Sequence, residues 1–408
     1  MAPTIVQAQF PARGVRLASL PPLALYVHLP WCVRKCPYCD FNSHEARAAV
    51  PEDSYVAALL ADLETTLPSV WGRRTHAIFL GGGTPSLFSA PAIDALLAGI
   101  RARLNVEPGA EITLEANPGT FEADKFRDFA AAGINRLSIG IQSFNSGHLA
   151  ALGRIHDADE ARRAVEIAQR YFANFNLDLM YALPEQTLAE AESDVALAVA
   201  TGAPHLSFYH LTLEPNTLFH RHPPSLPDED TQADIHESVG RLLVSAGYAH
   251  YETSAYARPD RECRHNLNYW RFGDYLGIGA GAHAKVSFAD RIVREVRART
   301  PAEYMRRVAQ GTQVVERRNL AASELPFEFM MNALRLTDGV PVAWFTDRTG
   351  VRIAALQEPL AAAEAKGLIE RDHQRIRPTP LGQRFLNDLL QIFLPEATAA
   401  RSGEEASG

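Results

Sequence analysis

A repeating unit, in which a short apolar stretch precedes an amphipathic stretch, runs along the chain to about residue 246. The apolar stretches have the length of buried strands, and the amphipathic stretches have helical spacing. Six units follow one another, with strands predicted at 25–29, 77–80, 112–116, 136–141, 175–180 and 206–211, and helices at 52–67, from about 91, at 122–132, after 157, after 187 and at 228–246. Strands that alternate with helices predict a parallel sheet with right-handed crossovers. The pattern therefore predicts an α/β fold, either an open doubly wound sheet or an incomplete barrel.

Polar residues and glycines gather directly after the predicted strands. They are the cysteines near residue 36, the glycines at 81–83, Glu115 with Asn117, Gln142, Asp178, and Tyr209 with His210. Each one alone can be explained by capping or turn formation. In barrels, however, the chemistry lies in the loops at the C-terminal ends of the strands. We therefore expect an incomplete barrel whose mouth faces a single cavity.

The pattern changes after residue 247. Further strands are predicted at 251–256 and 278–283, on either side of a loop at 258–274, and a helix at 301–309. The last part of the chain resembles a winged helix, which we interpret as a lid or docking domain. Its predicted elements are helices at 324–336, 342–349 and 354–366, two short strands at 368–370 and 375–377, and a helix at 380–394. The predicted organisation is an irregular arm (1–22), a barrel with associated strands (23–298), a winged-helix-like α+β domain (299–396) and a disordered tail (397–408).

Composition narrows the class of protein. The chain has 408 residues, a formal net charge of -8 and no long basic run, so nucleic acid is not an expected partner. Three of its four cysteines are clustered, which argues against a disulfide framework and for a reducing compartment. No apolar run approaches the ~20 residues of a membrane span. We expect a cytoplasmic protein, with peripheral membrane association left open.

The clustered cysteines Cys32, Cys36 and Cys39, here called the three loop cysteines, follow the first predicted strand with Cys-x3-Cys-x2-Cys spacing. Thiolates suit iron–sulfur clusters, zinc and copper. A structural zinc site usually takes four protein ligands. Three thiolates can instead hold a cubane cluster that keeps one iron open. A zinc loop completed by a remote His or Cys, and three unrelated buried cysteines, are the alternatives.

Several segments together resemble the radical SAM group that contains the oxygen-independent coproporphyrinogen oxidases and the HemW haem chaperones. They are Tyr26-x-His28-x-Pro30, Cys-x3-Cys-Pro-Tyr-Cys-Asp-Phe, Gly-Gly-Gly-Thr-Pro-Ser, Glu-Ala-Asn-Pro-Gly, Ser-Ile-Gly-Ile-Gln-Ser-Phe and Asp-Leu-Met-x-x-Leu-Pro. The resemblance, from about residue 25 to 335, implies an incomplete (β/α)6 barrel and a [4Fe-4S] cluster on the three loop cysteines, whose open iron binds S-adenosylmethionine. It implies contacts with that ligand at Tyr26, Gly82, Gly83, Thr84, Glu115, Gln142, Arg154, Asp178 and His210.

Two departures from the oxidases distinguish the branches of this group. The oxidases carry a further cysteine where this chain has Phe41, and a longer segment before the position of Tyr26. The segment His265-Asn266-x-x-Tyr269-Trp270 matches the motif of the HemW branch that is associated with haem binding. A histidine can be an axial haem ligand, and aromatic rings can pack on a porphyrin. Cys263 is an alternative ligand. In the structural alternative, His265 and Asn266 form hydrogen bonds with the loop backbone, and Tyr269 and Trp270 fill the core.

The resemblance implies a haem chaperone that binds haem, a cluster and S-adenosylmethionine and delivers haem to haem proteins, including respiratory subunits in the membrane. An oxygen-independent coproporphyrinogen oxidase and a zinc-stabilised interaction protein are the alternatives. Whether S-adenosylmethionine is cleaved, and whether the chain forms a homodimer, stay open. Because the His265 motif lies far along the chain from the cysteine loop, we expect some haem binding to survive loss of the cluster.

Overall fold

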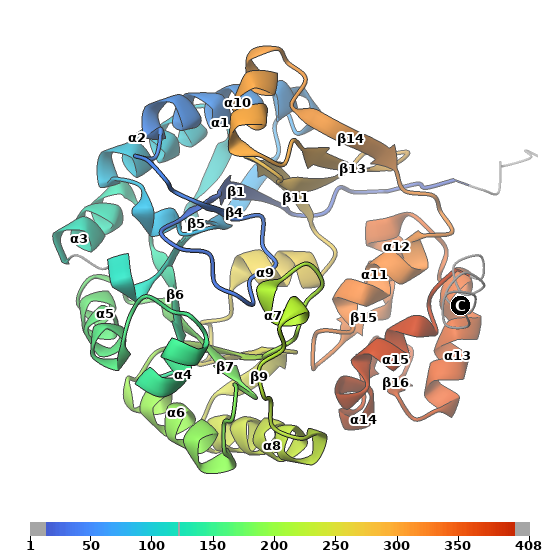
Figure 1. Cartoon of the computed structure of the whole chain (residues 1–408). Coiled ribbons are helices and arrows are strands. Elements are labelled where there is room, and N and C mark those ends of the chain that lie inside the picture. The colour runs from blue at the N-terminus through green and yellow to red at the C-terminus, as the bar shows by residue number, and fades with distance from the viewer. Residues whose placement is uncertain (1–13, 121–122, 396–408) are drawn as a thin grey trace, which may run out of the picture.

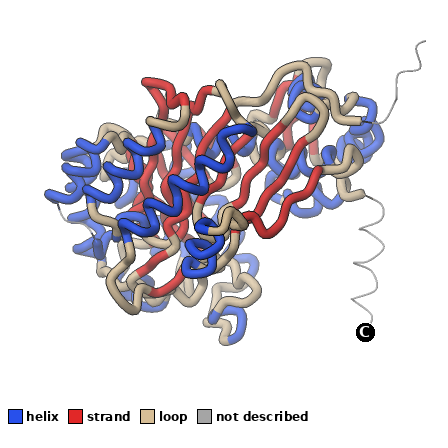
Figure 2. Tube along the Cα trace, turned by 90° about the horizontal axis from the view of Figure 1, so that it is seen from above, coloured by secondary structure: helices blue, strands red, loops and turns tan. Residues whose placement is uncertain are grey.

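Parallel strands, followed by helices that mostly lie on the outside, form the wall of an incomplete barrel (Figure 1). The computed structural model describes residues 14–120 and 123–395. The parallel strands are β1 (Leu23–Leu29), β4 (Arg74–Gly82), β5 (Asn105–Ala116), β6 (Arg136–Gln142), β7 (Phe175–Tyr181) and β8 (His205–His210). The helices that follow them are α1 (Glu52–Thr66), α2 (Ala90–Arg101), α3 (Ala123–Ala132), α4 (Ser146–Ala151), α5 (Ala158–Tyr171), α6 (Leu188–Ala200), α7 (Leu218–Arg221) and α8 (Glu229–Ser245). The six predicted strand–helix units are confirmed, and the sheet is a curved layer that does not close (Figure 2).

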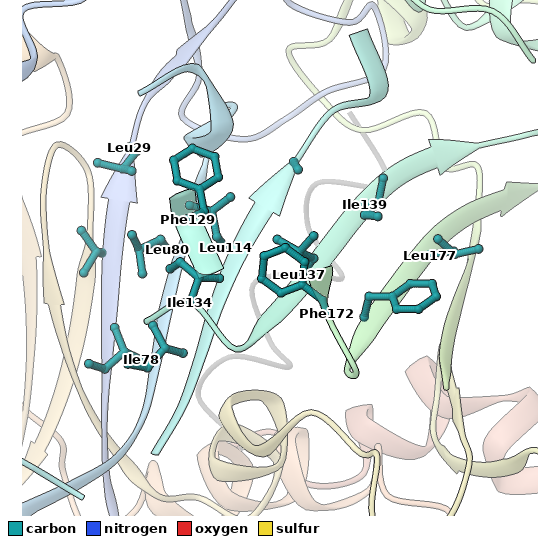
Figure 3. Packing of buried hydrophobic residues seen from close by; sticks show 14 of the residues in the cluster. Leu29, Ile78, Leu80, Leu114, Phe129, Ile134, Leu137, Ile139, Phe172 and Leu177 are labelled. Atoms are coloured by element: carbon teal, nitrogen blue, oxygen red, sulfur yellow. The ribbon is translucent and has the colours of Figure 1, made fainter. Parts of the chain in front are cut away.

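Side-chain alternation along these strands separates the core from the lumen of the barrel. On β6, Leu137 and Ile139 are fully buried and face the outer helices, where they belong to the main apolar cluster (Figure 3). The residues between them, Ser138 and Gly140, line the lumen. Successive side chains of a strand point to opposite faces, so one strand supplies both surfaces. Burial of each such Leu or Ile side chain contributes about 1.5–3 kcal/mol to the stability of the fold.

Side-chain caps begin several helices where the sequence predicts them. The Asp157 carboxylate accepts hydrogen bonds from the backbone of α5, and Thr187 does the same for α6; each forms a capping box with a glutamate three residues later. Ser89 accepts a hydrogen bond from the Ala92 amide at the start of α2. Local sequence therefore determines where these helices start.

The large sheet continues past both sides of the barrel wall. β11 (Asp274–Ile278) lies parallel to β1, and β12 (His283–Ser287), β13 (Ile292–Arg297) and β14 (Val314–Asn319) extend it antiparallel, while β10 (Ala255–Ala257) and β9 (Ala249–Glu252) extend the other edge beyond β8. The strand predicted at 278–283 is wrong, because Ile278 ends β11, His283 begins β12, and the residues between them form a turn. The strand predicted at 251–256 is two short strands. The predicted loop at 258–274 contains a helix, α9 (Arg264–Trp270).

The C-terminal part has its own small sheet and apolar cluster. Its helices are α11 (Leu325–Ala333), α12 (Val342–Thr349), α13 (Gln357–Ala365), α14 (Pro380–Arg384) and α15 (Leu386–Gln391), and its strands are β15 (Val340–Pro341), β16 (Ile369–Arg371) and β17 (Arg375–Pro378). This is the winged-helix-like α+β arrangement, with the predicted last helix divided at Phe385. Helix α10 (Pro301–Ala309) and β14 belong to the large sheet and its core, beyond the boundary expected at residue 298.

Some expectations fall on residues outside the described ranges. They are the first part of the arm (1–13), the start of the third helix (122) and the tail (397–408). In the described part of the chain, no helix is both long and apolar enough to cross a membrane.

Candidate functional site

A cavity of about 700 Å³ occupies the lumen of the barrel. This volume lies in the range of small-molecule and cofactor sites. Apart from Cys263, its lining includes the residues to which the sequence assigned a role, namely the three loop cysteines, Tyr26, Gly82, Gly83, Thr84, Glu115, Gln142, Arg154, Asp178, His210, His265, Asn266, Tyr269 and Trp270. The structure therefore brings these residues together, while their individual roles stay predictions.

The cysteine loop is held from several sides at the upper end of the lumen, where the parallel strands end. Two short strands, β2 (Trp31–Cys32) and β3 (His44–Glu45), pair at its base. Asn42 donates hydrogen bonds from its side chain to the Ala280 and Arg299 carbonyls, at 2.9 and 2.8 Å. Above the loop, the Phe219 amide of α7 donates to the Pro37 carbonyl at 3.0 Å. These contacts fix the loop against both the sheet and α7.

The three thiols in this loop are donors of the kind that an iron–sulfur cluster takes. All four cysteines are free thiols, and burial raises the pKa of Cys32 and of Cys39. Within the described ranges, no three His, Cys, Asp or Glu side chains are grouped as ligands of one ion. In a cubane cluster each thiolate binds a different iron, so its ligands stand farther apart than those of one zinc. The donor set of three thiolates fits such a cluster, and metal binding would release the thiol protons.

The glycine loop after β4 brings backbone against Glu115. Gly82 has φ +118°, and a Cβ there would lie 2.5 Å from the His28 ring, so only glycine fits. The Gly82 amide donates a hydrogen bond to Oε2 of Glu115 at 3.0 Å. Burial raises the pKa of Glu115 to about 7, against the lowering effect of this hydrogen bond. A nearby cation would favour the ionised carboxylate, so Glu115 can recognise an ammonium group.

Arg154 joins the cysteine loop to β6. Its Nη1 donates to the Cys36 sulfur at 3.5 Å and its Nη2 to the Gly140 carbonyl at 2.8 Å, whereas Nε is buried without a hydrogen-bond partner among the described residues. A guanidinium group in this position can pair with a ligand carboxylate. Asp178 is held by Ser138 and Asn176, each at 2.8 Å, and burial raises its pKa. Gln142 ends β6 with φ +66°.

Tyr26 and His210 occupy opposite walls of the cavity. The Tyr26 hydroxyl shares a hydrogen bond of 3.0 Å with Nδ1 of His28, and burial raises the Tyr26 pKa well above its usual value. His210 is exposed, and its Nε2 lies 2.8 Å from Oε1 of Gln232. Because Gln232 already engages the His210 side chain, the His210 backbone is an alternative point of contact with a ligand.

Helix α9 carries the predicted haem motif and depends on a glutamate from another strand. Its N-cap residue, Cys263, provides no side-chain cap. Instead Oε1 of Glu111, on β5, accepts hydrogen bonds from the amides of Arg264 and His265, at 2.9 and 3.3 Å. The Cys263 sulfur lies 3.6 Å from the same oxygen. Glu111 therefore fixes the start of α9 against the lower half of the lumen, towards the N-terminal ends of the strands.

His265 has the form that a metal ligand requires. It is 1% exposed, and burial lowers its pKa to about 3, so its imidazole is neutral at neutral pH. Its Nε2 lies 3.1 Å from the Tyr269 hydroxyl, one helical turn later, while its Nδ1 has no hydrogen-bond partner among the described residues. When Nε2 donates to Tyr269, Nδ1 presents a free lone pair. An unpartnered ring nitrogen on a cavity-lining residue fits an axial haem ligand.

Trp270 connects α9 to the C-terminal part of the chain. The Arg335 guanidinium carbon lies 4.2 Å from the centre of a Trp270 ring, and Nη2 of Arg335 pairs with Oε2 of Glu252 at 3.1 Å. The indole Nε1 is buried without a hydrogen-bond partner among the described residues. The Trp270 side chain also packs against the C-terminal apolar cluster. Trp270 therefore joins the cavity wall to the C-terminal part of the chain.

Two expectations change in view of this geometry. Cys263 is not among the described residues that line the cavity, and its thiol faces Glu111, so the structure favours His265 over Cys263 as a ligand. The cysteine loop and the His265 motif line the same cavity, although they are far apart in sequence. Distance along the chain is therefore no basis for expecting haem binding to be independent of the cluster.

Some cavity residues were missed by sequence reasoning. They include Arg136, Asn176, His205 and Ser207, which occupy inward positions on β6, β7 and β8. The alternation of polar and apolar residues within these strands, such as Arg-Leu-Ser-Ile-Gly-Ile-Gln in β6, is the signal that would have found them. Attention to the strand ends alone left this lower part of the lumen out.

Comparison with known proteins agrees with the fold. The Radical SAM superfamily profile matches residues 26–198, and the HemN C-terminal domain profile matches residues 320–385. "Heme chaperone HemW" of Escherichia coli (strain K12) is 51% identical over 382 residues, covering 93% of this chain and 100% of the relative. "Heme chaperone HemW" of Mycobacterium tuberculosis (strain H37Rv) is 34% identical over 400 residues, covering 96% of this chain and 100% of the relative.

Among solved structures, the coproporphyrinogen III oxidase HemN of Escherichia coli, a radical SAM enzyme, has the same fold. It superposes with a TM-score of 0.79 and 24% identity, over 92% of this chain and 90% of that chain. At this identity the similarity establishes the barrel and the C-terminal arrangement but carries no statement about activity. The radical SAM match implies a [4Fe-4S] cluster and S-adenosylmethionine as cofactors.

Proposed function

The chain belongs to the HemW family of radical SAM proteins, and we propose that it is a haem chaperone that holds haem in the barrel cavity. The observation that carries this proposal is the neutral, buried His265, whose Nδ1 has no hydrogen-bond partner among the described residues. His265 lines the same cavity as the three loop cysteines. Cargo and cofactors would then share one lumen.

The upper end of the lumen is proposed to hold the cluster and S-adenosylmethionine. The three loop cysteines would ligate the cluster, which supplies an iron with an open coordination position and a one-electron redox centre. Glu115 would receive the ligand's ammonium group, and Arg154 its carboxylate. The glycine loop would let the ligand approach backbone closely, because no side chain intervenes at Gly82.

Helix α9 is proposed to hold the haem. His265 would bind the iron, and the Tyr269 hydroxyl would set its tautomer and ring orientation, as groups behind a metal ligand commonly do. Trp270 would pack its apolar face on the porphyrin. The relatives are named haem chaperones. By this likeness, the cargo is proposed to pass to haem proteins, including membrane subunits of the respiratory chain.

Haem binding and transfer by one reconstituted sample would test the proposal. Anaerobically reconstituted protein should bind haem, and the His265→Ala variant should show a changed ligand-field spectrum, since loss of an axial nitrogen alters the iron's spin state. His222→Ala, at an exposed histidine outside the cavity lining, is the matched control. The loaded protein should then transfer haem to an apo-haem protein.

Two results would contradict the proposal. A haem spectrum and affinity indifferent to both His265 and Trp270 would move the cargo away from α9. Formation of protoporphyrinogen IX from coproporphyrinogen III would place the chain with the oxidases, despite Phe41 at the position of their additional cysteine. Phe41 is 61% exposed and lines the cavity, where it offers apolar surface but no thiol.

A further inference from the structure

The lower lumen contains a network of polar side chains that are paired with one another. Nδ1 of His205 lies 2.7 Å from Oδ1 of Asn176, and Nε2 of His205 lies 2.8 Å from the Tyr251 hydroxyl. Asn176 donates from Nδ2 to Ser138 at 2.8 Å and accepts from the Ser207 hydroxyl at 3.0 Å. A network with satisfied members is rigid and gives the floor of the cavity a fixed shape.

Arg136 lies beside this network without a hydrogen bond to it among the described residues, although its charge acts on the Asp178 carboxylate, which Ser138 and Asn176 bond. It is 2% exposed and lines the cavity, and its Nε has no hydrogen-bond acceptor among the described residues. Oε2 of Glu111 lies 4.0 Å from that nitrogen, which is within ion-pair range but beyond a hydrogen bond. Oε1 of Glu111 is already engaged by the backbone of α9. A buried guanidinium has five donor hydrogens, and leaving them unmet is costly.

We propose that Arg136 is the anchor for a carboxylate of the bound cargo, and that this carboxylate is a propionate of haem. The proposal rests on the haem-binding function above and names a second point at which the cargo is held. Arg136 and His265 flank the same Glu111 carboxylate, so an iron ligand and a carboxylate partner lie at the same end of the lumen. Haem carries its iron at the ring centre and its propionates at one edge, which suits two such points.

The carboxylate of S-adenosylmethionine is the other carboxylate that Arg136 could bind, and the length of strand β6 argues against it. Arg136 begins β6 and Gln142 ends it. Six residues of strand at about 3.3 Å each separate the two ends by roughly 20 Å. A ligand whose carboxylate binds a cluster on the three loop cysteines is held at the upper end. Arg154, which contacts Cys36, is the guanidinium within its reach.

Esterification of the propionates tests the proposal on cluster-reconstituted protein. Haem and haem dimethyl ester are titrated, and the affinity ratio is compared between the natural chain and Arg136→Gln. The natural chain should prefer haem by about 10- to 100-fold, the range of one or two charge-assisted hydrogen bonds. Arg136→Gln should lose most of this preference while binding the diester unchanged. Arg163→Gln, at an exposed arginine of α5 outside the cavity lining, should keep it.

The outcomes of this experiment distinguish failure of the Arg136 anchor from failure of haem binding itself. Equal binding of both porphyrins by the natural chain would overturn the anchor and leave haem binding intact; this measurement needs no variant and holds even where Arg136→Gln fails to fold. A preference for haem retained in Arg136→Gln would also overturn the anchor. Loss of S-adenosylmethionine binding in Arg136→Gln, with the preference for haem unchanged, would assign Arg136 to that ligand instead and overturn the anchor as well. Binding of neither porphyrin would overturn the proposed function and the anchor together.

Discussion

Ionisation of Glu115 should cost the protein stability at neutral and alkaline pH, and Glu115→Gln should remove that cost. Burial raises the pKa of Glu115 from its ordinary value of 4.5 to about 7. A folded state with the higher pKa retains its proton after the unfolded chain has released it. The stability of the natural chain therefore falls as pH rises from about 4.5 to 7, and the penalty is complete above that.

The size of the stability change follows from the difference between the pKa of Glu115 in the folded and in the unfolded chain. Each unit of pKa corresponds to 1.36 kcal/mol, so the full shift is worth about 3 kcal/mol. Because the carboxyl is partly exposed to the cavity, we expect Glu115→Gln to stabilise the ligand-free protein by about 1–3 kcal/mol at pH 8. Glutamine keeps the shape and an oxygen that can accept the Gly82 amide, so the difference should vanish below about pH 4.5.

Urea unfolding of metal-free protein between pH 5 and 8 measures this difference. Glu166→Gln, at an exposed glutamate of α5, is the matched control and should leave the pH dependence unchanged. The same Glu115 variant should bind S-adenosylmethionine more weakly, since the partner of the ammonium group is lost. A stability difference that is constant across this pH range, or a variant less stable at pH 8, would refute the reasoning.

Three further predictions concern the cluster, the cargo and the link to the C-terminal part. The reconstituted protein should contain about four irons and four sulfides per chain, as measured by iron and sulfide analysis. Replacing any one of the three loop cysteines with serine should abolish this content, whereas Cys263→Ser should retain it. Stoichiometric zinc without iron would contradict the prediction. Tyr269→Phe should change the haem spectrum less than His265→Ala, because it removes only the hydrogen bond to the ligand. Arg335→Ala should destabilise the protein by about 3–5 kcal/mol in thermal or urea unfolding, since it leaves Glu252 buried without its cation; an unchanged midpoint would show that the pair contributes nothing.

Features set by neighbouring residues could be predicted from the sequence. The strand–helix repeat follows from apolar spacing, and the helix starts at Asp157 and Thr187 follow from local capping boxes. The cysteine loop is readable because its three thiols lie within eight residues of sequence, Cys32 to Cys39. The strand ends correctly indicated one cavity, since the C-terminal ends of parallel strands meet at one side of the sheet.

Features set by distant residues could not be predicted. Helix α9 was taken for a loop because it has 7 residues and no side-chain cap of its own. Its cap comes from Glu111, which no local signal reveals. The turn between β11 and β12 was read as a strand because the pairing of Tyr275 with Lys285, rather than local propensity, sets that register. Arg136 was missed because only the inward alternation of β6 places it in the lumen.

The Glu111 cap also sets when the protein can become competent during synthesis. The bond from the Arg264 amide to Glu111 spans 153 positions of the chain. At about 5–20 residues per second, a ribosome needs roughly 8–30 s to produce that length after Glu111 is made. Through this interval the nascent strands exist without the helix that completes their cavity, and a closing contact of such long range forms slowly. Under the proposed placement of haem on α9, loading therefore has to wait until about the last third of translation.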